Sequence, residues 1–192
     1  MLSKRYWLWA AALALAPAPA FAHISVGHVT GFLHGMLHPI TGIDHILAML
    51  TVGLLASTRG GRALWLVPAA FLVTMTIGAA AGVMHMAVPY VETGIALSLV
   101  VFGALYATRL KLALSALCAV VGCFAFFHGY AHGAEVPASM PGLAYGAGFV
   151  LTTLLLQIAG IAIGLSLRDR PIFRFVAGGL VSVVGVVLAL AL

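Results

Sequence analysis

The sequence His38-Pro39-Ile40-Thr41-Gly42-Ile43-Asp44-His45-Ile46-Leu47-Ala48-Met49 opens an apolar segment and places ionisable side chains inside it. The segment continues to Ser57, and between Ile40 and Ser57 only Asp44 and His45 are ionisable. Its 18 residues are about enough to cross a bilayer. A carboxylate in hydrocarbon costs roughly 2.5 to 3.5 kcal/mol on insertion scales, and this segment has no Lys or Arg to pair with it. The pattern therefore predicts a membrane-spanning helix whose carboxylate binds a cation.

The composition extends this prediction to the whole chain. Of the 192 residues, 64% are hydrophobic and 7% are charged, whereas soluble domains are about 25% charged. The sequence contains no Gly-rich phosphate loop ending in Lys-Ser or Lys-Thr, so we expect no transport powered by nucleotide hydrolysis in this chain. We predict an all-α, polytopic membrane protein that is not an enzyme. We expect the protein to be embedded in the lipid bilayer. We attribute its net charge of +5 to the placement of cations by membrane topology rather than to nucleic-acid binding.

The first 22 residues have the pattern of a cleavable signal peptide. Lys4 and Arg5 precede an apolar run, and Ala20-Phe21-Ala22 is a small-x-small cleavage site. Cleavage there makes His23 the mature N-terminus, whose α-amine and imidazole together can chelate a metal ion. Residues 1–22 are thus predicted to be the signal peptide and residues 23–192 a single transmembrane helical domain.

Six membrane-spanning helices are predicted in the mature chain, at residues 40–57, 63–84, 93–108, 112–132, 143–167 and 174–192. The loops after the first, third and fifth of them hold the cations Arg59, Arg62, Arg109, Lys111, Arg168, Arg170 and Arg174, and the opposite loops hold none. This asymmetry predicts an N-out, C-out orientation in a bacterial inner membrane. The histidines and three of the four carboxylates then lie at the periplasmic side.

The first candidate metal ligands surround the opening stretch. His38 lies seven residues before His45, and His34 lies four residues before His38, so a continuous helix would place these imidazoles on one face. Pro39 lacks a backbone donor, and with Gly42 it predicts a bend or a restart of the helix at this point. Irregular backbone at membrane depth is tolerated where it lines a cavity, so the break itself favours a cation site formed by His34, His38, Asp44 and His45.

The second candidate group is His128, His132 and Glu135. Their spacing of i, i+4 and i+7 places all three on one face of a helix. Two imidazoles one turn apart and a carboxylate form a typical partial site for a divalent transition metal. The predicted topology brings this group to the same side of the membrane as the first, so that one shared site or two successive sites are both compatible with the sequence.

The ligand types narrow the choice of metal ion. Imidazole and carboxylate donors suit Ni²⁺, Co²⁺, Zn²⁺ or Cu²⁺ better than Mg²⁺ or Ca²⁺. The two cysteines, Cys118 and Cys123, lie outside both groups and are interpreted as packing residues. No bound cofactor is expected, because the metal ion is interpreted as the transported substrate. The sequence leaves a homo-oligomer open.

Two motifs resemble those of the HupE/UreJ family, whose members are associated with hydrogenase and urease gene clusters. They are His-Pro-x-x-Gly-x-Asp-His-x-x-x-Met at residues 38–49 and Phe-His-Gly-x-Ala-His-Gly-x-Glu at residues 127–135. The resemblance covers essentially the whole mature chain. It implies a nickel or cobalt permease that uses His38, Asp44, His45, His128, His132 and Glu135.

Two other functions remain compatible with the same side chains. An intramembrane zinc-dependent hydrolase would need an open coordination position and a general base, for which Asp44 or Glu135 is suitable. No His-Glu-x-x-His motif is present to support it. A b-type haem protein would need two axial histidines facing each other across helices, for which His45 with His128 or His132 is suitable.

Overall fold

The computed structural model describes residues 31–136 and 142–192, and every regular element in these ranges is helical. The predicted signal peptide at residues 1–22 and His23 lie outside the described residues. The elements are α2 (Gly31–Leu37), the 3-10 helix η1 (His38–Ile40), α3 (Ile43–Arg59), α4 (Ala63–Val83), α5 (Val91–Thr108), α6 (Leu114–Ala134), α7 (Gly142–Ser166) and α8 (Pro171–Leu190).

Five helices, α4 to α8, are long and apolar enough to cross a membrane. The bent pair formed by residues 31–40 and 43–59 counts as a sixth span if it is taken as one. The predicted class, an all-α polytopic membrane protein, is therefore confirmed, and the six predicted segments correspond to α3 through α8 with ends that differ by a few residues. The orientation in the membrane stays a prediction.

The chain bends by 82° between η1 and α3. Pro39 is buried within η1, the Thr41 hydroxyl donates to the carbonyl of His38 at 2.7 Å, and Gly42 adopts an extended conformation before α3 begins. The bend predicted at Pro39 and Gly42 is thus confirmed. The alternative arrangement, with His34, His38 and His45 on the face of one continuous helix, is wrong. The helix α2 ends at Leu37, and the chain bends between His38 and His45.

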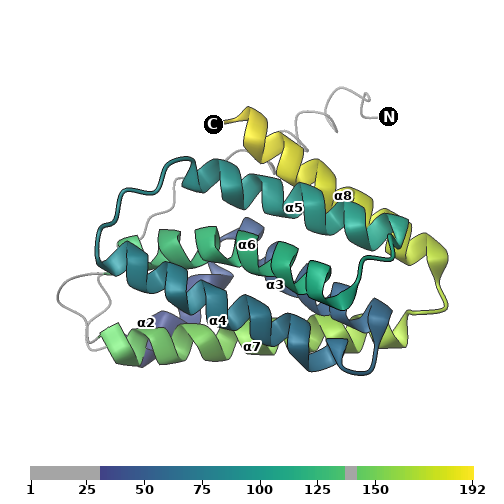
Figure 1. Cartoon of the computed structure of the whole chain (residues 1–192), viewed down its shortest axis with the longest axis horizontal. Coiled ribbons are helices and arrows are strands. Elements are labelled where there is room, and N and C mark those ends of the chain that lie inside the picture. The colour runs from purple at the N-terminus through teal and green to yellow at the C-terminus, as the bar shows by residue number, and fades with distance from the viewer. Residues whose placement is uncertain (1–30, 137–141) are drawn as a thin grey trace, which may run out of the picture.

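The helices associate in pairs, α3 with α7, α4 with α6, and α5 with α8, while α2 packs on α7 (Figure 1). In the α4–α6 pair, Gly129 and Gly133 of α6 lie against the carbonyl groups of Met75 and Ala79 of α4. A Cβ atom at either glycine would overlap that carbonyl, so only glycine permits this approach. The two glycines directly follow His128 and His132, and close packing of α6 therefore fixes where those imidazoles lie.

Successive long helices alternate in direction, so two ends of the bundle can be distinguished (Figure 1). The histidine end contains the start of α3, the α4–α5 connection and the end of α6. The basic end contains the α3–α4, α5–α6 and α7–α8 connections, around residues 57–62, 109–112 and 167–174. All described Lys and Arg residues are at the basic end, as the predicted charge asymmetry requires.

Candidate metal centre

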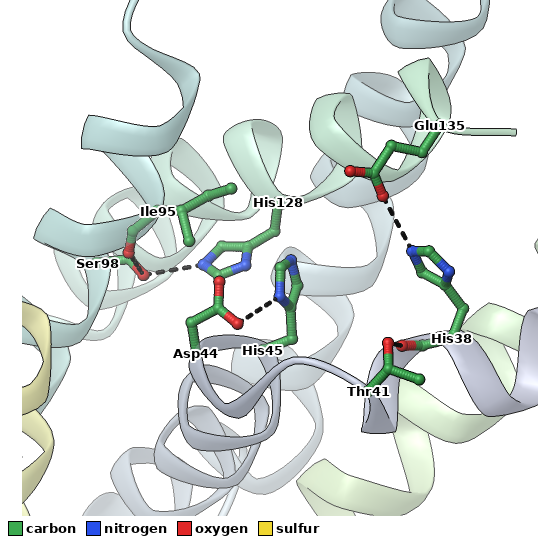
Figure 2. Close-up of polar contacts among 8 residues, drawn as sticks. All are labelled: His38, Thr41, Asp44, His45, Ile95, Ser98, His128 and Glu135. Carbon is green, nitrogen blue, oxygen red and sulfur yellow. Dashed lines mark hydrogen bonds and ion pairs between the residues drawn. The ribbon is translucent and has the colours of Figure 1, made fainter. Parts of the chain in front are cut away.

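His128 lies at the centre of the histidine end and is fully buried. Its Nε2 is 2.9 Å from the hydroxyl of Ser98 in α5 (Figure 2). The Ser98 hydroxyl donates its single proton to the carbonyl of Ile95 at 2.6 Å, so it accepts from His128. Nε2 of His128 therefore carries the proton, and Nδ1, which is buried and has no hydrogen-bond partner among the described residues, presents a free lone pair.

His45 is oriented in the same way by its neighbour Asp44. Its Nδ1 lies 2.9 Å from the Asp44 carboxylate, and both side chains are mostly buried at the start of α3 (Figure 2). A carboxylate that accepts from one imidazole nitrogen fixes the tautomer and leaves the other nitrogen deprotonated. That other nitrogen, Nε2, is buried and without a partner within the described ranges. Asp44 thus supplies both a negative charge and the orientation of His45.

His132 connects these residues to His38. Both of its ring nitrogens are buried, and neither has a hydrogen-bond partner in the part of the chain that the structure describes. Its ring centroid lies 4.2 Å from that of His45 and 4.8 Å from that of His38. Phe149 of α7 covers it at 4.3 Å. The ring of His132 thus contacts two imidazoles and one apolar ring.

His38, His132 and Glu135 form an outer triad. One ligand atom from each lies within 4.8 Å of the other two, and His38 Nε2 lies 3.1 Å from a Glu135 oxygen (Figure 2). The Glu135 side chain is 60% exposed and follows the last turn of α6. The hydrogen bond from His38 holds the pKa of the Glu135 carboxyl below its ordinary value. The triad therefore offers a charged carboxylate to the outside of the bundle.

Asp44, His45 and His128 form an inner group, and His132 of the outer triad lies next to it, with its ring centroid 4.2 Å from that of His45. Leaving a buried polar atom unpaired costs roughly 1–3 kcal/mol. If no ligand were bound, the unpaired ring nitrogens of three adjacent histidines would lower the stability of the fold considerably. Neutral imidazole nitrogens beside carboxylates are the donors that divalent transition metals prefer. The arrangement can bind such a cation and, because the two groups adjoin, can pass it inward.

All six residues of the two predicted motifs meet in this region. They are His38, Asp44, His45, His128, His132 and Glu135, drawn from η1, α3 and α6. His34 is half-buried in α2, and within the described residues it makes no side-chain hydrogen bond or ring contact with this group. The His45 and His128 ring centroids are 5.0 Å apart, which leaves no room for a haem between them.

Two residues of this region were not among the predicted ligands. Ser98 sits in the middle of α5, and nothing in the sequence indicates its contact with His128. Glu92, in the first turn of α5, is close enough to interact electrostatically with Asp44, His45 and Glu135. The sequence does contain an indication of Glu92, because this residue is a lone carboxylate at the start of an apolar span, on the same predicted side of the membrane as both motifs.

The fold and this cluster define a multi-pass helical membrane protein with a histidine and carboxylate centre at one end. The sequence matches the family described as HupE / UreJ protein over residues 11–188. It is also 44% identical over 173 residues to Protein HupE of Rhizobium leguminosarum bv. viciae, an alignment that covers 88% of this chain and 90% of the relative. The chain belongs to the HupE/UreJ family. No solved structure matches it significantly.

Proposed function

We propose that the protein is a permease that takes up a divalent transition metal ion, Ni²⁺ or Co²⁺, across a bacterial inner membrane. The observation that carries the proposal is the set of buried nitrogens on His45, His128 and His132 beside Asp44, which have no hydrogen-bond partner among the described residues. Membership in the HupE/UreJ family supports it, since the motif resemblance implies nickel or cobalt transport. Zn²⁺ and Cu²⁺ fit the same donors and are the competing ions in any test.

In this proposal the outer triad captures the ion from the periplasm. Glu135 and the imidazoles of His38 and His132 replace part of its water shell. His132 then transfers it to the inner group, where Asp44 compensates its charge and the neutral nitrogens of His45 and His128 bind it. The ordering follows exposure, because Glu135 is the most exposed of these residues and His128 is fully buried.

The orientation belongs to the same proposal. With the histidine end in the periplasm, the basic end faces the cytoplasm, in agreement with the positive-inside rule. A reporter enzyme that is active only in the periplasm, fused after Leu192, should be active. The same reporter fused within residues 109–112 should be inactive, and the reverse result would overturn the orientation.

The central test is uptake of Ni²⁺ and Co²⁺ by cells that express the wild type, Asp44→Asn or His128→Asn. Asp44→Asn keeps an acceptor for His45 and removes only the charge. Both variants should lose uptake while remaining in the membrane at wild-type levels. The matched control is His85→Asn, because His85 is an exposed histidine at the same end with φ of 51°, a conformation that asparagine tolerates.

Metal analysis of the purified protein separates the proposal from a zinc hydrolase. Weak, exchangeable Ni²⁺ or Co²⁺ binding that is reduced in Asp44→Asn supports a permease. Tightly bound stoichiometric Zn²⁺ together with unchanged uptake in Asp44→Asn would overturn the proposal and direct attention to hydrolysis.

A further inference from the structure

Two cavities of the described structure lie at the basic end, away from the histidine end. One has a volume of about 320 Å³ and lies between the ends of α3, α5 and α6. The other, of about 240 Å³, lies between α3, α5, α7 and α8. Thr58, Arg59 and Arg109 line both cavities, so the two cavities adjoin.

Five cationic side chains line these cavities: Arg59, Arg109, Lys111, Arg168 and Arg174. Arg59 is held between the two by a hydrogen bond from Nη2 to the carbonyl of Leu110 at 3.4 Å. Nε of Arg174 is buried and has no hydrogen-bond partner among the described residues. The acidic group at this end is Asp169, which pairs with Arg168 at 3.6 Å. Five cations therefore line the cavities, while the carboxylate at this end lines neither and already pairs with Arg168.

Arg109, which lines both cavities, also has an unusual backbone conformation. It ends α5 with φ of 58° and ψ of 31°, a left-handed conformation that a non-glycine residue adopts at some cost. Membrane topology alone requires only that cations lie on this side. It does not require that they converge on cavities, and Arg62 and Arg170 satisfy the same rule without lining either one.

We propose that the paired cavities bind a phosphate group, carried either by an anionic lipid headgroup or by a free phosphate ion. Guanidinium groups form paired, charge-assisted hydrogen bonds with phosphate oxygens. Basic pockets between helices near the cytoplasmic surface are typical sites for phospholipid headgroups. A bound phosphate would satisfy Arg174 Nε and reduce the mutual repulsion of the arginines. The proposal does not depend on the metal-transport function.

The test uses the full-length protein in mild detergent, with Arg174→Gln as the variant. Arg62→Gln removes the same charge from the same end and is the matched control, because Arg62 is exposed and lines neither cavity. Native mass spectrometry after addition of phosphatidylglycerol or phosphatidylcholine measures retained lipid. Isothermal titration of delipidated protein with inorganic phosphate measures binding of the free ion. Circular dichroism checks folding, and Arg109→Gln replaces Arg174→Gln if the latter does not fold.

We expect phosphatidylglycerol, but not phosphatidylcholine, to remain on the wild type and on Arg62→Gln. Retention should fall roughly tenfold in Arg174→Gln, which corresponds to the loss of one strong charge-assisted contact. Phosphate binding that is lost in Arg174→Gln would identify the free ion as the ligand. Equal retention of both lipids by all three proteins, with no binding of inorganic phosphate, would overturn the proposal.

Discussion

Ser98 determines which nitrogen of His128 carries the proton. Its hydroxyl donates to Ile95 and therefore accepts from Nε2 of His128, which leaves Nδ1 free to bind a metal ion. Ser98→Ala should lower metal affinity roughly 10–100-fold, the usual cost of removing a residue that orients a ligand. Titration of purified protein with Ni²⁺ measures the effect. Ser57→Ala is the control, because the Ser57 hydroxyl also donates to a carbonyl in its own helix but lies at the basic end.

An unchanged affinity in Ser98→Ala would show that the tautomer of His128 is set by something else. A fall in affinity in both serine variants would indicate general damage to the bundle. The comparison is useful because the two substitutions remove the same atom from similar intrahelical contacts.

Gln157 is fully buried in α7, and both atoms of its amide lack hydrogen-bond partners within the described residues. It follows Phe149 and Thr153 at intervals of four on one helix face, about 12 Å along α7 from the ring that covers His132. Gln157→Leu should stabilise the bundle, because it removes a buried amide whose lack of partners costs roughly 1–3 kcal/mol. It should also reduce uptake if this amide lines the cation path. Thermal unfolding and uptake measured together check the prediction, which fails if the variant is less stable than the wild type.

The spatial grouping of the six candidate ligands could be predicted from the sequence, because they cluster in two short motifs. Spacing along one helix placed His128, His132 and Glu135 together, and the unpaired charge of Asp44 marked the other motif. Ser98 could not be found, since its contact with His128 joins residues 30 positions apart. The tautomers of the histidines depend on such contacts, so they could not be predicted from the sequence either.

At the level of the helices, the glycines after the two α6 histidines set the position of the centre. Gly129→Ala should separate α4 from α6, because the new methyl group would overlap the Met75 carbonyl. We expect a loss of thermal stability and of metal binding together. Gly146→Ala in α7 is the matched control. Nothing lies within 4 Å of a Cβ at that glycine, so alanine should be neutral or stabilising by up to about 1 kcal/mol.

Differential scanning measurements on both glycine variants, followed by Ni²⁺ titration, check this prediction. Equal stability of the two variants would mean that α4 and α6 can separate freely, and that their close approach does not fix the histidines.

The helices themselves were predictable from runs of apolar residues bounded by Arg, Gly and Pro. The chemistry of Pro39 and Gly42 predicted a break but not its angle. The bend of 82° depends on how α2 packs against α7, where Thr152 donates to the carbonyl of Met36 at 2.9 Å. The pairing of α4 with α6 depends on which glycines face each other, and this also requires the folded structure.

Across the whole molecule, metal binding should weaken as the pH falls from 7.5 to 5.5. Protons compete with metal ions for imidazole nitrogens, and metal binding releases protons, so the affinity falls as the proton concentration rises. Glu135 does not titrate in this range, because the hydrogen bond from His38 holds its carboxyl pKa below the ordinary value of 4.5. Glu135→Gln should therefore lower the affinity to a similar extent at pH 6 and pH 8. Ni²⁺ titrations across this range test both statements, and binding that strengthens toward pH 5.5 would contradict them.

Charge is divided between the two ends of the molecule, with three carboxylates among the histidines and seven cations at the basic end. In the proposed orientation the membrane voltage, negative inside, acts along this axis. A divalent ion that moves inward gains about 4.6 kcal/mol per 100 mV, since each elementary charge is worth about 2.3. We expect uptake into vesicles to accelerate under a potassium diffusion potential, whereas equal rates at zero voltage would mean that a compensating charge moves too. Dissipation of the voltage alone, with the protein and the external metal unchanged, should then deprive the cell of the ion.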